Sequence, residues 1–512
     1  MCFRTSISIL ALAVCALPAQ ARVIPALVTP SDGGVAWSAA ERAALRTRVD
    51  ALFASSSAIR GSHVGLYAVD TRDGSLLYSR LPDDEFMPAS TLKLLVGSVA
   101  LARLGTAFRF HTEAFFTQPV ADRVEPGFLV VRGGGDPFLN DANLNDLATT
   151  VATKVRSMQD GVATDSSYFD DERYPTGWVW DDLPFYYAPV VTATTFEENV
   201  VHLTVTAGAA VGDPARVRAS VLGPITAIPI EGCGLTVEVL VIPSAKTGRH
   251  GSESTIDVRR ERGGCIEVIG SVPLGGSDTA DAAVPSPEEF LHTVLTRRLQ
   301  FIGVSAGSLS QVAGPWPDEH RYVVRTSDQR QLVWTHDSEA LPNIVADMWY
   351  PSDNLVAELL LKALGVARSG VPGTTANGAA LEREWLHSIG VDTRTVTLAD
   401  GSGLSIYDRI TPHDLVAILQ ADWNGPNRRL VLDALPVAGV RGTLREEFVD
   451  TPAAGRAFVK TGSMSHVRGL AGYVESRRHG AVTFALMVDD WNGDTAPLDR
   501  FRGAVLSALL AT

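Results

Sequence analysis

Apolar residues near the start of the chain follow helical spacing and then strand spacing. Residues Ser38–Glu41 form a capping box, and leucine and valine side chains continue at helical spacing through residue 52. Two short strand-like runs, 64–69 and 76–78, then flank the turn pair Asp73-Gly74. This arrangement predicts one amphipathic helix followed by a β-hairpin.

The far end of the chain mirrors this layout. Strand-like runs occupy 457–459, 470–474 and 482–488, and a final helical run occupies 498–510. A further run at 92–101, after Pro88, is apolar on nearly every side and predicts a buried helix. Helices and strands from both ends therefore predict one layered α/β domain.

The middle of the chain, from about residue 115 to 329, has a different pattern. It is rich in Val, Thr, Gly and Pro, and it contains short alternating segments such as 200–205 and 235–241. These features are typical of β-structure. We therefore expect a β-rich region inserted into the α/β domain.

The composition restricts the class of protein. A chain of 512 residues with 46% apolar and 20% charged residues is an ordinary globular mixture. Its net charge of −14 argues against nucleic acid or an anionic membrane as a partner. A small or electrically neutral substrate is expected instead.

The first 21 residues are predicted to be a secretory signal peptide. Arg4 precedes an apolar stretch at 7–17, and Ala19-Gln20-Ala21 supplies small residues at the cleavage site. No later segment approaches the roughly 20 continuous apolar residues of a transmembrane helix. We therefore expect an exported protein, periplasmic or otherwise extracytoplasmic, without a transmembrane segment.

Cleavage would leave two of the four cysteines, Cys233 and Cys265. An oxidising compartment permits a disulfide between them, and both lie in short strand-like segments preceded by glycine. Two buried free thiols are the alternative. Two thiols alone cannot form a structural zinc site, and no His-Glu-x-x-His stretch occurs. We expect no metal and no other cofactor.

Ser90 and Lys93 form the first candidate catalytic pair. At i and i+3 in the first turn after Pro88, the Ser90 hydroxyl and the Lys93 ammonium share a helix face. Burial and the positive end of the helix dipole disfavour charge on the lysine, which helps it act as a base toward the serine. Only five of the 44 basic residues are lysines, and an apolar residue stands three positions before each of the other four. A solvated Ser-x-x-Lys pair is therefore the less favoured interpretation.

Ser352-Asp353-Asn354 precedes another buried helical run and forms the second candidate motif. A hydroxyl and an amide two residues apart can face one cleft. Ser352 could relay a proton between Lys93 and a leaving amine, and Asn354 could donate to a peptide carbonyl. Taken alone, the triplet is equally typical of a helix cap.

Lys460-Thr461-Gly462-Ser463 ends the strand-like run 457–459. A lysine, hydroxyls and the N–H groups of a strand edge would hold a carboxylate, and Gly462 would let a substrate backbone approach closely. The same triplet recurs at Lys246-Thr247-Gly248 in a polar loop, so it is weak by itself. A Gly-x-Ser-x-Gly sequence at 303–307 follows a helical run instead of a strand, and we do not expect it to be a nucleophile elbow.

The three motifs in this order are those of penicillin-binding proteins and class A β-lactamases. With the wide spacing between the first two motifs, the chain resembles the D-alanyl-D-alanine carboxypeptidase/endopeptidase family, the class C low-molecular-mass penicillin-binding proteins (peptidase S13). Further stretches similar to family landmarks lie at 87–90, 134–137, 175–178, 352–358, 400–405, 435–439 and 442–444. Trp349-Tyr350-Pro351 stands where a more polar approach to the second motif is expected.

The resemblance implies an α/β fold of the penicillin-binding-protein/β-lactamase-like transpeptidase type. Such a domain has an antiparallel sheet with helices on both sides, here with β-rich inserted domains. Residues 22–115 plus 330–512 are the expected catalytic domain, and 116–329 are the expected insert. Two subdomains are expected in the insert, one of about 116–200 plus 315–329 and one of about 201–314.

The resemblance also implies roles for individual residues. Ser90 would be the acylated nucleophile, Lys93 its base, Ser352 and Asn354 the second motif, and Lys460 the anchor for the terminal carboxylate of the substrate. Substrate binding would also involve Thr461, Gly462 and Ser463, with the N–H groups of Ser90 and Ser463 as the oxyanion hole. Asp165 is expected either to recognise a peptide side chain or to belong to a solvated loop.

The expected function is an exported serine D,D-peptidase that acts on peptidoglycan stem peptides. It would cleave D-alanyl-D-alanine bonds as a carboxypeptidase and D-alanyl-meso-diaminopimelyl bonds as an endopeptidase, and β-lactams would inhibit it covalently. One alternative is a β-lactamase, although no Glu-x-x-x-Asn occurs between Asn354 and Lys460. Another is a slow β-lactam or cell-wall-binding sensor.

Overall fold

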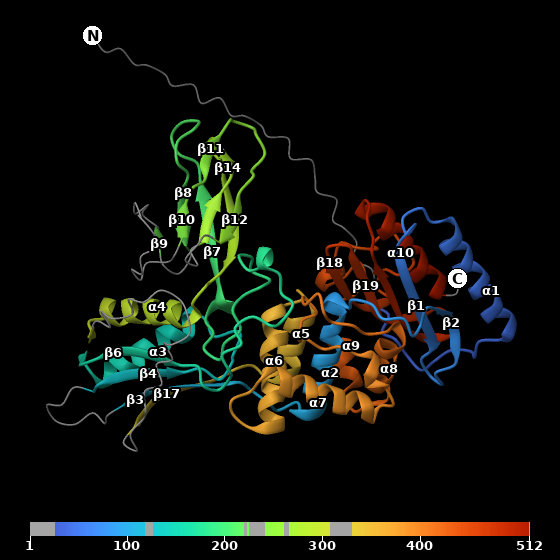
Figure 1. Cartoon of the computed structure of the whole chain (residues 1–512), viewed down its shortest axis with the longest axis horizontal. Helices are drawn as coiled ribbons and strands as arrows, with labels where there is room; N and C mark the ends of the chain where they lie inside the picture. The colour runs from blue at the N-terminus through green and yellow to red at the C-terminus, as the bar shows by residue number, and fades with distance from the viewer. Residues whose placement is uncertain are drawn as a thin grey trace, which may run out of the picture.

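A computed structural model describes residues 26–117, 126–219, 223–224, 241–260, 266–307 and 330–510. These residues form a main domain, built from both ends of the chain, and an inserted region beside it (Figure 1). The expected signal peptide, the segment 235–240 and both Cys233 and Cys265 lie outside the described residues. Within the described ranges, none of the helices combines the length and the apolar character needed to cross a membrane.

The main domain is built on a five-stranded antiparallel sheet that joins the two ends of the chain. The strand order is β18 (Ala457–Met464), β19 (Val467–Ser476), β20 (Gly480–Asp489), β1 (His63–Asp70) and β2 (Leu76–Arg80). The predicted hairpin and meander are therefore present. They become neighbours because all eight residues of β1 pair with residues 482–489 of β20.

Neighbouring residues of a strand point to opposite faces of a sheet. In β19 and β20 almost every residue is buried, so helices cover both faces. On one face, α1 (Ala39–Ser55) and α10 (Thr495–Leu509) pack over Leu470 and Leu486. On the other face, Ala471 and Met487 join a larger helical core. This arrangement confirms the predicted layered α/β fold.

Within the described residues, six helices contribute to the larger core. They are α2 (Lys93–Arg103), α5 (Leu341–Trp349), α6 (Asn354–Ser369), α7 (Thr375–Ser388), α8 (Pro412–Asn424) and α9 (Arg428–Ala434). Two of them, α2 and α6, carry residues of the site described below. Three short 3-10 turns belong to the same domain: η1 (Ala89–Leu92), η4 (Thr393–Thr395) and η5 (Gly442–Leu444).

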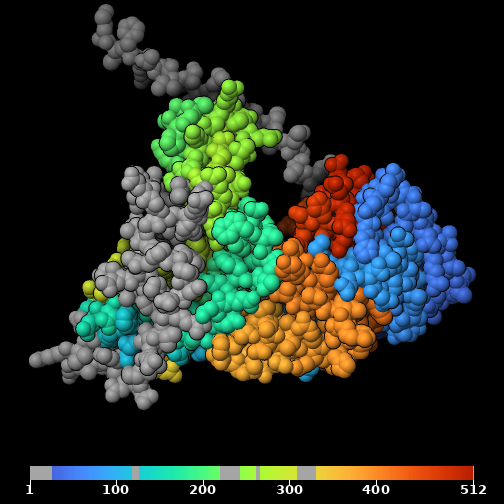
Figure 2. All heavy atoms as spheres, in the orientation of Figure 1, coloured from blue at the N-terminus to red at the C-terminus, as the bar shows by residue number. Residues whose placement is uncertain are grey.

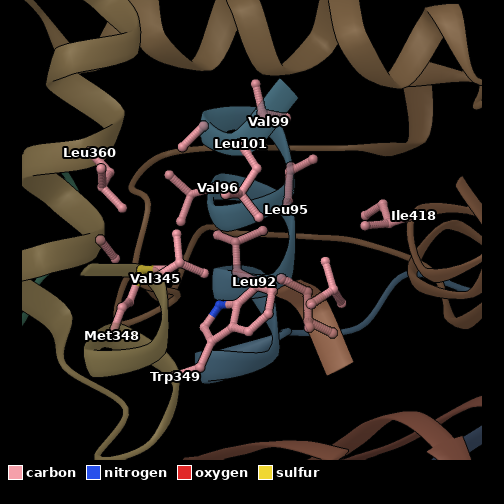
Figure 3. Close-up of a cluster of buried hydrophobic side chains, with 14 of the residues drawn as sticks. Leu92, Leu95, Val96, Val99, Leu101, Val345, Met348, Trp349, Leu360 and Ile418 are labelled. Atoms are coloured by element: carbon pink, nitrogen blue, oxygen red, sulfur yellow. The ribbon is translucent and has the colours of Figure 1, made fainter. Parts of the chain in front are cut away.

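Helix α2 is buried on nearly every side, as its sequence predicts (Figure 3). Trp349, which is fully buried, packs across Gly97 of this helix. A Cβ atom at residue 97 would lie 2.6 Å from Trp349 Cζ2. The apolar Trp349, unexpected before the second motif, thus closes the core around the helix that begins at Lys93.

The first part of the inserted region is an α/β subdomain. Its four-stranded sheet has the order β17 (Gln331–Asp337), β3 (His111–Phe116), β4 (Phe128–Arg132) and β6 (Gly161–Asp165), with a small pair of β5 (Ser157–Met158) and β16 (Ser305–Ala306). Helices α3 (Asp141–Lys154) and α4 (Pro287–Phe301) pack against each other and belong to its core.

These pairings move the limits of the insert outward. The boundaries expected at 115/116 and 329/330 fall inside β3 and just before β17, yet these two strands pair with each other, and β3 also pairs with β4. The inserted region therefore spans about 111–337. Helix α4, expected in the second subdomain, packs on α3 and β6 of the first, because its apolar face completes the core of that sheet.

The second part of the insert is a β-subdomain of about 200–284, whose described residues form strands and loops but no helix. One sheet has β15 (Ser277–Ala283), β7 (Val200–Thr206), β8 (Arg216–Ala219) and β9 (Gly223–Pro224); a second has β10 (Val241–Pro243), β13 (Ile266–Ile269) and β12 (Asp257–Arg260); and β11 (Lys246–Gly248) pairs with β14 (Ser271–Pro273). The strand predicted at 200–205 is present as β7.

The insert docks on the main domain through the segment that follows β6. Figure 2 shows green atoms from this part of the chain against the orange helical part of the main domain. Phe169 is buried in the main-domain core, and the buried Lys362 of α6 forms a salt bridge with Asp170. The short turns η2 (Trp180–Asp182) and η3 (Glu197–Asn199) belong to the same stretch.

The Gly97–Trp349 contact gives a stability prediction. Gly97→Val would overpack the junction of α2 and α5 and is expected to lower the free energy of unfolding by about 1–3 kcal/mol. Urea denaturation followed by tryptophan fluorescence measures the change. Ala102→Val, at an exposed position of the same helix, is the matched control, and equal effects of the two variants would contradict the packing argument.

Candidate active site

Ser90 lies in the 3-10 turn η1, and Lys93 is the first residue of α2. This geometry brings Lys93 Nζ to 2.8 Å from Ser90 Oγ. The same amine is 2.6 Å from Asn354 Oδ1 and 2.8 Å from the carbonyl oxygen of Ser402. Because Lys93 is fully buried, these three protein oxygens are its hydrogen-bond partners in the described structure.

Ser352 and Asn354 stand at the start of α6. Asp353 caps this helix by accepting a hydrogen bond from the Val356 N–H, and Ser352 adopts a positive φ of 71° immediately before it. Asn354 then connects the two parts of the molecule, because its Oδ1 faces Lys93 and its Nδ2 donates to the carbonyl of Tyr187 at 2.6 Å. The Ser352-Asp353-Asn354 triplet is thus both a helix cap, through Asp353, and a part of the site, through Asn354.

Lys460 lies inside β18, not after its end, because the pairing with β19 continues to Met464. Its Nζ donates to Ser352 Oγ at 2.8 Å and to its neighbour's carbonyl, Thr461 O, at 2.9 Å. Strand β18 is an edge of the sheet, so half of its backbone N–H and C=O groups face away from β19. The third motif thus contacts the second through Lys460 and Ser352.

Gly462 has a different neighbour from the one expected. A Cβ atom there would lie 2.7 Å from the Pro88 carbonyl oxygen and 3.2 Å from the Thr91 nitrogen. The absence of a side chain therefore lets the turn that carries Ser90 pack on β18, whereas we expected room for a substrate backbone. Thr461 Oγ1 lies 2.9 Å from Thr443 Oγ1, and Ser463 is exposed.

Burial controls the charge of both lysines. It lowers the pKa of Lys93 to about 8, although the negative charges of Asp400, Asp353 and Glu358 raise this pKa in part. Burial also lowers the pKa of Lys460 well below its ordinary value, and the positive charge of Lys93 lowers it further. The site therefore favours neutral amines more strongly than water does.

A family model described as the D-Ala-D-Ala carboxypeptidase 3 (S13) family matches residues 45–508. The chain belongs to this family. A D-alanyl-D-alanine carboxypeptidase of Actinomadura sp. is 31% identical over 478 residues, which cover 90% of this chain and 84% of that protein. The S13 membership confirms the family and the enzyme class that the motifs predict.

Solved structures confirm the fold of this S13 member. The crystal structure of penicillin binding protein 4 (dacB) from Haemophilus influenzae matches with a TM-score of 0.74 at 22% identity, covering 90% of this chain and 99% of that one. A structure of the same protein complexed with a novel β-lactam matches with a TM-score of 0.71 at 21% identity and the same coverage of both chains.

The S13 motifs omit several groups that complete the site. Tyr187 and Ser402 contribute through backbone carbonyls, as does Lys93 itself, whose carbonyl accepts from Trp349 Nε1 at 2.9 Å. A backbone carbonyl leaves no residue-type signal, so sequence reasoning missed these contacts. The sequence signal that lies beside these contacts is the stretch that begins at Asp400, which is similar to a family landmark.

Three other candidates lie apart from the Ser90 cluster. Asp165 ends β6, where its carboxylate accepts from Arg132 Nε at 2.8 Å and from the Ser167 N–H at 3.0 Å; recognition of a peptide side chain by Asp165 stays a prediction. Lys246 is exposed on β11 of the β-subdomain. Ser305 lies in β16, and helix α4 precedes it, so it lacks the strand-to-helix turn of a nucleophile elbow.

The small number of lysines allows a direct test of the site's electrostatics. We expect the NMR resonances of ¹³C-labelled lysine to show a group with a midpoint near pH 8 that is missing in Lys93→Arg, and a second depressed midpoint that is missing in Lys460→Arg. Ordinary midpoints near 10.5 for both would contradict the burial argument.

The same shift has a consequence for stability. Between about pH 8 and 10.5 the unfolded chain holds the Lys93 proton more tightly than the folded protein does. The Lys93 contribution to the free energy of unfolding therefore rises with pH through this window.

Proposed function

We propose that this protein is an exported serine D,D-peptidase that releases D-alanine from peptidoglycan stem peptides through an acyl-enzyme on Ser90. The observation that carries the proposal is the contact of the buried Lys93 amine with the Ser90 hydroxyl at 2.8 Å. The neighbouring contacts of Asn354 with Lys93 and of Lys460 with Ser352 support it, as does membership of the S13 family.

The hydrogen-bond partners of Lys93 suit a base. A neutral amine has two N–H donors and one lone pair. The two donors would serve Asn354 Oδ1 and the Ser402 carbonyl, and the lone pair would accept the proton of the Ser90 hydroxyl. Because burial holds the pKa of Lys93 near 8, a substantial neutral fraction exists close to neutral pH.

The reaction would then proceed in two steps. Ser90 Oγ attacks the carbonyl carbon of the penultimate D-alanine while its proton passes to Lys93, and the N–H groups of Ser90 and Ser463 stabilise the oxyanion. The C–N bond breaks as the leaving D-alanine nitrogen receives a proton, relayed through Ser352. Water next attacks the ester carbonyl carbon and gives a proton to Lys93. The bond between this carbon and Ser90 Oγ then breaks, the shortened peptide leaves as its carboxylic acid, and the proton returns to Ser90 Oγ.

Lys460 is suited to bind the terminal carboxylate of the substrate. It forms no salt bridge with any described residue, and its described hydrogen bonds go to a hydroxyl and a carbonyl. A buried cation without a counter-ion is costly, so an incoming carboxylate would stabilise its charged form. The Thr461 and Ser463 hydroxyls would supply further donors to the same carboxylate.

The finer features of the proposal follow from the same serine. Attack on a D-alanyl-meso-diaminopimelyl bond would give endopeptidase activity, and attack on a β-lactam carbonyl would give a stable acyl-enzyme and inhibition. Among the described hydrogen bonds, Ser90 Oγ is reached only by Lys93. The described contacts of Ser90 Oγ therefore give no support to the β-lactamase alternative.

The proposal is tested by substituting Ser90 and the lysines of the two Lys-Thr-Gly triplets, Lys460 and Lys246. Ser90→Ala should abolish covalent labelling by a fluorescent penicillin and D-alanine release from a pentapeptide stem. Lys460→Ala should lower kcat/KM for D-alanine release by about tenfold or more, because a charge-assisted hydrogen bond to the carboxylate is lost. Lys246→Ala, which changes the other Lys-Thr-Gly copy, should match the wild type.

Mass spectrometry of the products from pentapeptide and cross-linked muropeptides separates the two peptidase activities. Labelling of Ser90→Ala at the wild-type rate would refute the nucleophile. Penicillin labelling without any D-alanine release would instead identify a sensor.

A further inference from the structure

A loop without helix or strand, residues 399–405, passes behind Lys93, and we call it the pinned loop. Six of its backbone N–H groups donate to the carboxyl oxygens of three acids. Asp408 accepts from Ala399 and Asp400, Glu358 from Gly401 and Ser402, and Asp400 from Gly403 and Ser405. Carboxyl groups thus replace the backbone partners that a helix or a sheet would supply.

The three acids are among the most deeply buried polar residues of the protein. Asp400 and Asp408 are fully buried, and Glu358 is 1% exposed. Burying an acid without partners is costly, yet here each one accepts hydrogen bonds from the loop. Such an arrangement holds the loop in place, because a shift would leave several buried N–H groups without partners at the same time.

The pinned loop contacts the residues on both sides of the Ser90 turn. The Ser402 carbonyl accepts from Lys93 Nζ at 2.8 Å. At Gly403, where φ is +78°, a Cβ atom would lie 1.9 Å from the carbonyl oxygen of Ala89. A glycine is therefore required for the loop to pack directly on the residue that precedes Ser90.

We propose that Glu358 is a positioning residue for acylation, which holds the 401–402 backbone so that the Ser402 carbonyl keeps the Lys93 amine directed at Ser90. Its oxygens accept from Gly401 N–H at 3.1 Å and from Ser402 N–H at 2.8 Å. Glu358 lies on α6, one turn after Asn354, so one helix supplies an oxygen to Lys93 directly and orients a second one through the loop. The inference rests on the proposed function of Ser90 and Lys93.

Glu358 also acts on Lys93 through charge. The charged groups that act on the amine are Asp353 and Glu358 from the start of α6, Asp400 from the pinned loop and Lys460 from β18. Negative charge on Glu358 raises the pKa of Lys93. Burial and the negative charge of Asp400 raise the pKa of Glu358 itself to about 8, so this charge acts on Lys93 mainly above about pH 8.

Two substitutions separate the charge of Glu358 from its reach. Glu358→Gln keeps the length of the side chain, removes the charge and places an N–H₂ group against one of the loop donors. Glu358→Asp keeps the carboxyl group and shortens its reach to the loop. Glu382→Gln is the matched control, because Glu382 is a buried acid of α7 that hydrogen-bonds no described loop N–H and whose Oε2 has no partner.

The rate constant for acylation by a fluorescent penicillin, measured from pH 6 to 9, is the test. It reports only folded, reactive molecules, so partial unfolding does not mimic the effect. Both Glu358 variants should show a maximal rate about tenfold or more below the wild type, as expected for a misplaced catalytic base, and Glu382→Gln should stay within about twofold. Because the pKa of Glu358 is itself about 8, the loss in Glu358→Gln should already be present at pH 6 to 7, where the carboxyl group is largely uncharged.

Unchanged maximal rates in both Glu358 variants would overturn the positioning role, as would an equal loss in Glu382→Gln. A merely structural role would lower the labelled amount and the melting temperature without changing the rate constant or its pH midpoint, and this result would also overturn the inference. Absence of acylation in the wild-type protein would instead overturn the proposed function itself.

Discussion

The site depends on one constraint, the complete burial of the Lys93 amine. A buried amine must have a partner for each of its hydrogens or lone pairs. Ser90, Asn354 and Ser402 supply these partners from three distant parts of the sequence. The packing of α2 against α6 and the course of the pinned loop therefore have to agree around a single nitrogen atom.

The same constraint explains why the inserted region is docked and not merely attached. Asn354 offers its oxygen to Lys93 while its amide N–H₂ group donates to the Tyr187 carbonyl of the insert, so one side chain joins the base to the insert. Trp178, also in the insert, donates its indole N–H to Asp400 at 2.9 Å. Two separate hydrogen bonds thus connect the insert with groups that surround the base.

The sequence predicted the parts of this arrangement that depend on side-chain type. Ser90 and Lys93 at i and i+3, a helix cap at 352–354 and the strand that leads to Lys460 could all be inferred from local spacing, and the structure brings these motifs together. The pairing of β3 with β17 could not, because it joins segments more than 200 residues apart. The boundaries of the insert shifted for this reason.

The contacts that sequence reasoning missed share one physical property. Tyr187, Ser402 and Lys93 each contribute a backbone carbonyl, which every residue type possesses. Their positions are determined instead by the groups that fix the backbone, such as Glu358 for the 401–402 peptide and the missing side chain at Gly403 for the contact with Ala89. Buried acids and tightly packed glycines close to a catalytic motif therefore indicate where the backbone, not a side chain, completes the site.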